Sequence, residues 1–493
     1  MGQTEGMTPF RLEEPPRDVA KHGPRAARPR DSVTRPGFGN CRQCGPVAIY
    51  LICQQDDRNV RTRLTGLFLA GMTAVALLAV AASGVAAYAQ SPGQLEARQT
   101  ARTPATAAAA PKQKPASKKS VDKQPGAQQA DKLSRTEFTQ ADEAAARLPG
   151  MPADVRFWGD SVADFQRALP TEPGPWLILS TGGEEGAYGA GFLNGWAATG
   201  TRPQFSVITG VSTGALMATY VFAGGKYDEE LHQVYTTISA TDIFEVAATP
   251  ESLSDNWPLG KTIEKRVTPE MLAAVAAEHQ KGRRLFVVTT NLDAGRPTVW
   301  NMGVIAAQGG DAGLKLFRQV LLAAASIEGM FPPVYFTVEA NGRQFQEMHG
   351  DGGATGPLYF GPEAYLVPTS TVRFPATALY AIFNGKLSTE FYLPSRSTAG
   401  ILGRSIGIAL KAGGRLQIAL AGVAAQKAGI PLNVTYVDDG FAQVGRGLFD
   451  PKLMNALYDY GLAQGRGEDR FHKGPPTPTP TASSGAPSET VPK

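Results

Sequence analysis

The sequence predicts an α/β fold in which a mostly parallel sheet lies between two layers of helices. Short apolar runs of strand length alternate with longer segments of helical pattern between residues 135 and 472. Continuous apolar strands are typical of parallel sheets, because both faces of such a sheet are covered. Three glycine-rich turns lie at or near the ends of strand-like runs, where the sites of such sheets gather. We therefore expect a three-layer sandwich with its functional groups at one edge of the sheet.

The elements follow from the apolar pattern. Strands are expected at 176–180, 204–210, 283–293, 344–348, 377–385 and 432–438. Helices are expected at 187–198, 215–223, 271–280, 314–326 and 400–426. The first two strands each run into a glycine-rich turn and then a helix, which is the connection that parallel strands require.

The two ends of the chain differ from this body. Residues 1–63 form a basic leader with 11 Lys/Arg against 7 Asp/Glu, and residues 64–89 are an uncharged apolar stretch ending in Ala-Tyr-Ala. The stretch predicts a secretory signal cleaved after Ala89, with an uncleaved membrane anchor as the alternative. We therefore expect export across the inner membrane. Residues 90–134 and 473–493 have the composition of a disordered linker and a disordered tail.

The position of the apolar stretch also suggests a different start. A signal sequence ordinarily begins a chain, so we hypothesise that translation starts at Val60. All three cysteines lie before residue 64, which excludes disulfides and thiol catalysis from the body. Cys41-x-x-Cys44 has no second pair or histidine nearby, so we expect no metal or redox role for it. Residues 64–493 hold 37 basic and 37 acidic residues, a balance that argues against nucleic acid as a partner.

The strongest motif is Gly210-Val211-Ser212-Thr213-Gly214. It directly follows an expected strand and directly precedes an expected helix, which is the context of a nucleophile elbow. The glycines let the chain turn sharply, so the Ser212 hydroxyl would be exposed above a helix N-terminus. The alternative is a tight strand-to-helix turn with a capping serine.

A serine nucleophile needs a base. The histidine order of common hydrolases would require His472, which borders the predicted tail and has no visible anchor. Asp351, in the turn Gly350-Asp351-Gly352-Gly353, is the better candidate because its glycine neighbours allow close approach of another loop. His349 is the rival base.

The third element is Ser180–Gly186, between the first expected strand and the first expected helix. Exposed N–H groups in such a turn can form an oxyanion hole. The alternative is a dinucleotide fold, which the glycines within 189–195 loosely resemble. Glu184 and Glu185 would repel a pyrophosphate there. No P-loop, H-E-x-x-H or metal-ligand cluster is present in the sequence, so we expect no cofactor and no metal.

Together these elements resemble the patatin-like phospholipase family. They read STGGEEGAYGAGFL at 180–193, GVSTG at 210–214 and DGG at 351–353, and the resemblance covers about residues 175–370, the core of a catalytic domain at 135–472. It implies a modified α/β-hydrolase sheet and a Ser–Asp dyad, with Ser212 as nucleophile and Asp351 as base. The residues it implies for the oxyanion hole and as motif glycines are Gly182, Gly183 and Glu184, and Gly210, Gly214, Gly352 and Gly353.

The resemblance also implies a lipid or phospholipid ester as substrate and a membrane surface as partner. The sequence departs from the family pattern at two positions: Glu185 stands where the family usually has a basic residue, and Thr181 replaces the first loop glycine. A carboxylate there is predicted to disfavour anionic head groups. Serine acyl hydrolysis of lipid esters is therefore the main hypothesis. A non-catalytic envelope protein that binds lipid or a partner, and a nucleotide-binding enzyme, are the alternatives.

Overall fold

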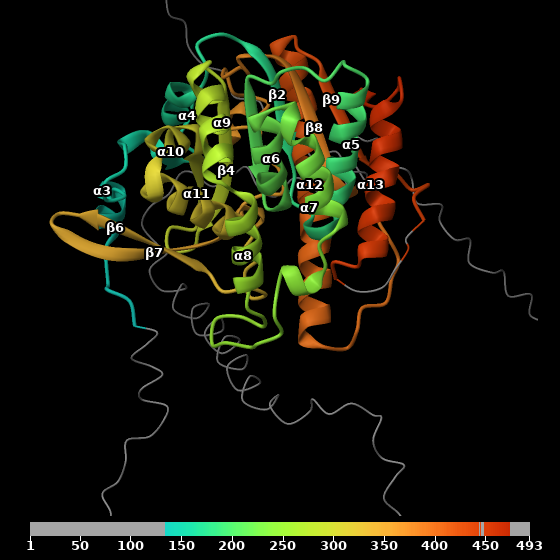
Figure 1. Ribbon diagram of the computed structural model, residues 1–493. Helices are drawn as coiled ribbons and strands as arrows, with labels where there is room; N and C mark the ends of the chain where they lie inside the picture. The colour runs from blue at the N-terminus through green and yellow to red at the C-terminus, as the bar shows by residue number, and fades with distance from the viewer. Residues whose placement is uncertain (1–133, 443, 445–447, 474–493) are drawn as a thin grey trace, which may run out of the picture. The chain divides into compact units, whose positions relative to one another are not determined.

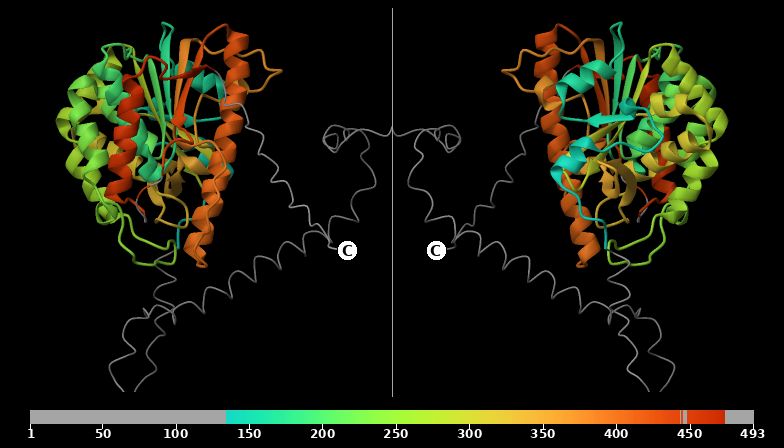
Figure 2. Two further views of the ribbon diagram at one scale, coloured as in Figure 1. Left: turned by 90° about the vertical axis from the view of Figure 1, so that its right-hand side faces the viewer. Right: turned by 90° about the vertical axis from the view of Figure 1, so that its left-hand side faces the viewer.

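The computed structural model describes residues 134–442, 444 and 448–473 (Figure 1). The predictions for the basic leader, the apolar stretch 64–89, the linker up to residue 133 and the tail from residue 474 lie outside the described residues. Within the described part, helices cover both faces of a central sheet (Figure 2). The predicted α/β class is confirmed.

The strands and helices of the described residues have the following bounds. The strands are β1 Arg156–Trp158, β2 Gly174–Leu179, β3 Val207–Val211, β4 Arg284–Asn291, β5 Arg296–Asn301, β6 Val334–Ala340, β7 Arg343–Asp351, β8 Ala376–Lys386, β9 Leu432–Val437 and β10 His472–Lys473. The helices are α3 Gln140–Ala145, α4 Val162–Ala168, α5 Gly186–Ala198, α6 Thr213–Ala223, α7 Asp228–Thr236, α8 Trp257–Arg266, α9 Pro269–Gln280, α10 Met302–Gln308, α11 Gly310–Ala324, α12 Thr398–Ala428 and α13 Pro451–Arg466.

The sheet has a parallel centre and antiparallel edges. Its strand order is β1-β5-β4-β3-β2-β8-β9-β10, and the neighbours from β4 to β9 are parallel. The β6–β7 hairpin leaves this path and pairs antiparallel with the end of β4, where Thr289 lies opposite Asp351. In the parallel pair of β3 and β4, Val211 lies opposite Val288. These two registers bring the ends of β3 and β7 to the same end of β4.

Two hydrophobic cores lie on the two faces of the sheet. On one face α5, α6, α9, α11 and α13 cover the central strands, with Phe192, Phe222 and Phe317 fully buried. On the other face α4, residues 358–374 and the C-terminal half of α12 pack around Phe165 and Trp176. The strands read as continuous apolar runs because side chains on both faces are buried.

Glycines bring α5 and α13 into close contact. A Cβ on Gly191, Gly195, Gly461 or Gly465 would lie between 2.0 and 2.3 Å from a backbone oxygen of the other helix. Small residues four apart allow such close helix packing. Gly191 and Gly195 therefore pack α5 against α13 inside the core, and Gly189 lies against Asn384 of β8. This use removes the sequence basis for a dinucleotide-binding turn.

Candidate active site

Ser212 occupies the turn between β3 and α6. Its backbone has φ 56° and ψ −126°, and it is one of three non-glycine residues with positive φ in the described part of the chain. Such a conformation is strained for a residue with a side chain, and it is held only where the surrounding structure enforces it. Ser212 is 4% exposed. The motif predicted this sharp strand-to-helix turn, and its role as a nucleophile elbow stays a prediction.

The two motif glycines allow this turn to form. A Cβ on Gly210 would lie 2.5 Å from the carbonyl oxygen of Gly214, and a Cβ on Gly214 would lie 2.5 Å from the carbonyl oxygen of Leu179. A real Cβ does not approach an oxygen so closely. The absence of side chains at both positions therefore lets β2, β3 and α6 converge beneath Ser212.

Asp351 ends β7 and is fixed through its backbone. Its N–H donates to the carbonyl oxygen of Ser326 at 2.8 Å, and its own carbonyl oxygen accepts from Thr290 Oγ1 at 2.8 Å. The Gly353 N–H donates to Asp351 Oδ1 at 2.7 Å. A Cβ on Gly352 would lie 2.6 Å from the carbonyl oxygen of Val288, so this motif glycine allows the turn to lie against β4.

The structure brings Ser212 and Asp351 together at the end of β4. Burial raises the pKa of the Asp351 carboxyl to about 7, while the Ser212 side chain and the Gly353 N–H act to lower it. Asp351 Oδ2 is buried, and it makes no hydrogen bond of standard geometry with the described residues. A carboxylate that keeps a free oxygen beside a serine hydroxyl, with a pKa near neutrality, has the properties of a general base.

The glycine-rich loop after β2 turns sharply toward α5. Gly182 has φ 158° and Gly183 has φ 57°, and the short 3-10 turn Gly183–Glu185 leads into α5. A Cβ on Gly182 would lie 2.4 Å from the carbonyl oxygen of Asn384. Asn384 also anchors the loop, since its Nδ2 donates to the carbonyl oxygen of Ser180 at 2.9 Å.

The three predicted oxyanion donors differ in their surroundings. Within the described residues, the backbone N–H groups of Gly182 and Gly183 donate no backbone hydrogen bond. The Glu184 carboxyl interacts with its own N–H and with that of Phe449, and both lower its pKa, although burial raises it more. The Glu184 N–H is therefore directed at its own side chain. The geometry favours Gly182 and Gly183 as donors over Glu184.

Glu185 lies beside two lysines that the sequence reasoning missed. Burial raises its pKa to about 7, Lys411 of α12 and Lys386 of β8 lower it, and the neighbouring carboxylates raise it. Lys386 Nζ pairs with Glu390 at 3.3 Å, and Lys411 pairs with the same carboxylate. The basic charge absent from the loop is thus supplied by more distant elements, which no local motif signals. The expected discrimination against anionic head groups stays a prediction.

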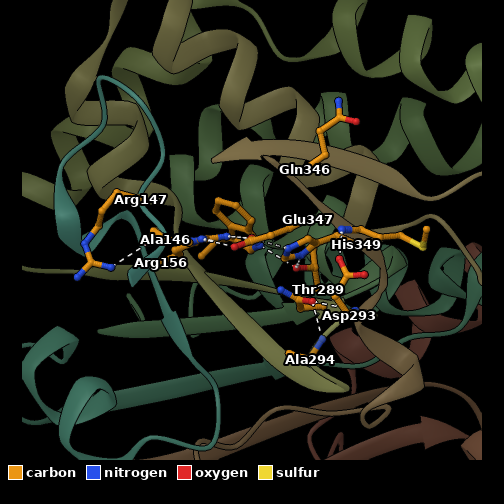
Figure 3. Close-up of polar contacts among 12 residues, drawn as sticks. Ala146, Arg147, Arg156, Thr289, Asp293, Ala294, Gln346, Glu347 and His349 are labelled. Carbon is orange, nitrogen blue, oxygen red and sulfur yellow. Dashed lines mark hydrogen bonds and ion pairs between the residues drawn. The ribbon is translucent and has the colours of Figure 1, made fainter. Parts of the chain in front are cut away.

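The rival base His349 is engaged elsewhere. Its Nδ1 lies 2.9 Å from Thr289 Oγ1 and its Nε2 lies 3.3 Å from Glu347 Oε2 (Figure 3). Burial lowers the pKa of His349. Glu347 is fully buried and also pairs with the Arg156 guanidinium, with Nη2 at 2.9 Å from Oε1. Both ring nitrogens have partners in this cluster, so the contacts of His349 are those of a structural residue.

His472 has an anchor, and the expectation that it has none was wrong. It begins β10, pairs with Val434 of β9, and stacks on Tyr436 with ring centroids 4.6 Å apart. A two-residue strand at the edge of a tail gives almost no apolar pattern, so the sequence did not reveal it. Strands β2, β8 and β9 separate β10 from β3, which ends at Ser212.

An apolar cavity reaches the residues beside the candidate nucleophile. Its volume is about 50 Å³, and Gly183 of the loop and Thr213 of the elbow line it together with apolar side chains of α6, α7, α8, α11 and α13. The apolar lining includes Leu216, Tyr235, Ile238, Ile243, Leu259, Ile263, Leu321 and Phe449. These residues are distant from one another in the sequence, so no motif predicted the cavity. Within the residues that the structure describes, no group of His, Cys, Asp and Glu could hold a metal ion.

Comparison with known proteins confirms the family resemblance. Residues 177–360 match the model of the family described as patatin-like phospholipase, and the matched range includes both Ser212 and Asp351. Residues 177–360 are therefore similar to the patatin-like phospholipase family, as the motifs predicted.

The other two comparisons add little to this similarity. No curated protein matches the sequence. Among solved structures, the crystal structure of VipD from Legionella pneumophila is similar, with a TM-score of 0.32 and 11% identity. The similarity covers 60% of this chain and 66% of that chain.

Proposed function

We propose that this protein is a serine acyl hydrolase that cleaves the carboxylic ester of a lipid through an acyl-enzyme on Ser212. The observation that carries the proposal is the pairing of a strained serine elbow with a buried carboxyl at the end of β4. Strained backbone and a perturbed pKa occur together at catalytic sites more often than elsewhere.

In this mechanism Asp351 moves the proton. Ser212 Oγ attacks the ester carbonyl carbon while its proton passes to the Asp351 carboxylate. The same proton then goes to the oxygen of the leaving alcohol as the ester bond breaks. Water attacks the acyl-enzyme in the second half, again through Asp351, and releases the fatty acid. A pKa of about 7 suits both proton acceptance and proton return near neutral pH.

Backbone donors would stabilise the tetrahedral intermediates. The N–H groups of Gly182 and Gly183 belong to the turn next to the Ser212 elbow, and their backbone is fixed by Asn384. Loss of one such donor typically costs roughly 3–4 kcal/mol of transition-state stabilisation. The cavity beside Gly183 and Thr213 supports a lipid substrate, since its apolar lining next to the nucleophile suits the carbon chain of an acyl group.

The test is ester hydrolysis by three variants of the full chain. We expect Ser212→Ala and Asp351→Asn each to lower kcat/KM for a soluble short-chain ester about a thousandfold or more. His349→Gln serves as the control, because it changes the neighbouring histidine and is expected to keep activity within a few-fold of wild type. Circular dichroism verifies folding of each variant. An active Asp351→Asn beside an inactive, folded His349→Gln would reverse the assignment of the base.

Glu185 favours a second candidate function, a lipid-binding envelope protein with a degenerate site. In that case a folded wild-type chain would bind lipid and hydrolyse no ester. We also propose export across the inner membrane, on the basis of the apolar stretch 64–89 and its Ala-Tyr-Ala end. N-terminal sequencing of the mature protein checks this: a start at Gln90 supports export with cleavage, and an intact residue 1 in the cytoplasm contradicts it.

A further inference from the structure

The longest helix and the loop before it carry an exposed apolar surface. In the loop, Phe391, Tyr392 and Leu393 are 93%, 54% and 80% exposed. We define the α12 surface as these three residues together with Ile401, Ile408 and Leu416, which are 58%, 54% and 61% exposed. Single exposed apolar side chains are common, but a contiguous run of large ones marks an interaction site.

The N-terminal half of α12 extends away from the core. All buried residues of α12 lie from Gly414 onward, where the helix packs on β8 and β9. The side view shows α12 running along the edge of the body (Figure 2). An α-helix turns by about 100° per residue, so Ile401, Ile408 and Leu416 lie within about 80° of one another around the axis of α12. They therefore form one exposed stripe along the helix.

The segment that contains α12 and the loop before it is strongly basic. Residues 387–428 contain Arg396, Arg404, Lys411, Arg415 and Lys427, and their single acidic residue is Glu390. The helix itself contains no acidic residue. Basic side chains beside an exposed apolar stripe are typical of helices that lie on anionic membrane surfaces.

The inner face of α12, opposite the exposed stripe, reaches the candidate active site. Leu410 of α12 lies 3.6 Å from the position that a Cβ on Gly353 would take, in the turn that begins with Asp351. Lys411, the next residue, lowers the pKa of Glu185 in the glycine-rich loop. This turn of α12 therefore lies close to both halves of the site.

We propose that the α12 surface docks onto an anionic phospholipid bilayer, with Phe391 and Leu393 inserted among the lipids and α12 lying in the interface. This inference rests on the proposed function, because it describes how a lipid ester would reach the site. It specifies the part of the molecule that meets the membrane and the charge of the bilayer surface that this part prefers, independently of the head group that the active site accepts.

Two other arrangements fit the observations less well. Within the described residues, α12 is the one helix long and apolar enough to cross a membrane by length and composition. Crossing would bury Arg404, Lys411 and Arg415 in hydrocarbon and remove Ile418 from the core, both at high cost. A second copy on the same surface would bring two segments of equal positive charge together, which is unfavourable.

The first experiment measures insertion at one position. Phe391→Trp in a Ser212→Ala background is mixed with vesicles of phosphatidylglycerol and phosphatidylcholine that carry bromine on their acyl chains. The matched control is Val367→Trp, because Val367 is also exposed, at 45%, but lies in the loop beside the C-terminal end of α12. Fluorescence of the Ser212→Ala parent gives the background of the native tryptophans.

We expect bromine to quench the added fluorescence of Phe391→Trp strongly and that of Val367→Trp hardly at all. Omission of phosphatidylglycerol or addition of salt should weaken the quenching, because screening removes the attraction of the basic residues. Equal quenching of the two variants, or none in Phe391→Trp, would overturn the proposal. The readout is local, so it reports on this loop whatever other segment of the chain contacts the membrane.

The second experiment separates docking from catalysis. The double variant Phe391→Ser/Leu393→Ser should lose about tenfold or more of its hydrolysis of vesicular phospholipid, since two large apolar side chains no longer insert. Its hydrolysis of a soluble short-chain ester should stay within twofold of wild type. Equal rates on vesicles, or a change of oligomeric state in place of vesicle binding, would overturn the proposal. No hydrolysis of either substrate by wild type would instead refute the proposed function, and quenching would still test docking.

Discussion

Replacing Asp351 by asparagine should stabilise the fold at alkaline pH while it abolishes ester hydrolysis. The carboxyl is 3% exposed, and burial raises its pKa from the ordinary 3.8 to about 7. The folded state therefore binds a proton in a pH range in which the unfolded chain has released it. The resulting stability is fully present below pH 4, falls as the pH rises, and is lost once the pH passes about 7. Asparagine keeps an oxygen for the Gly353 N–H and has no charge to bury.

The size of the effect follows from the two pKa values. Relative to a neutral side chain, ionisation of Asp351 lowers the free energy of unfolding by about 2 kcal/mol at pH 5 and about 4 kcal/mol at pH 8. The stability difference between Asp351→Asn and wild type should therefore grow by about 2 to 3 kcal/mol over this range. Other buried carboxyls, such as Glu328 with a pKa raised to about 8, are present in both proteins and cancel in the comparison.

Urea unfolding of the two full-length proteins at pH 5 and pH 8 measures this difference. Tryptophan fluorescence follows the transition, and the slopes must agree between the proteins for the comparison to hold. A variant that is equally stabilised at both pH values, or is destabilised at pH 8, would refute the reasoning. It would mean that Asp351 is not a buried carboxyl with a raised pKa.

Three further predictions follow from the same structure. The value of kcat/KM for an uncharged soluble ester should rise about tenfold per pH unit up to about pH 7 and then level off, because Asp351 must be ionised to act as base; a flat profile would contradict this. Gly214→Ala should abolish activity and lower the free energy of unfolding by about 1–3 kcal/mol, since its Cβ would overlap a backbone oxygen. Gly260→Ala in α8 has room for the added methyl group and should raise the free energy of unfolding by about 0.5–1 kcal/mol. Urea unfolding compares the two variants. Arg156→Met should lower the free energy of unfolding by about 3–5 kcal/mol, because it leaves the buried Glu347 carboxylate without its cation. Urea unfolding measures this loss, and the fraction of the variant that stays folded should keep its hydrolytic activity.

Much of the candidate site could be predicted from short segments of sequence. Ser212, Asp351 and the loop glycines each lie in a turn whose glycines are required sterically, and such turns leave a local pattern. The sequence also predicted the parallel centre of the sheet, since its strands are buried on both faces and read as apolar runs. Local requirements of this kind are visible without knowledge of the fold.

Other features depend on residues that are distant in the sequence. The edge strands β1, β5 and β6 were not predicted, because β1 is three residues long, β5 contains Pro297, and β6 alternates between buried and exposed positions. The lysines beside Glu185 come from β8 and α12, and the apolar cavity is lined by five helices and the loops between them. The pKa of Asp351 likewise depends on burial by the whole fold.

The most direct test of the central claim is labelling of the serine itself. A fluorescent fluorophosphonate reacts with an activated serine and needs no knowledge of the lipid substrate. We predict that the wild-type chain is labelled at Ser212, identified by mass spectrometry of the modified peptide, and that folded Ser212→Ala is not labelled. Asp351→Asn should be labelled at least a hundredfold more slowly, because its serine has lost the base. A well-folded wild type that takes no label, or takes it at another serine, would contradict the account.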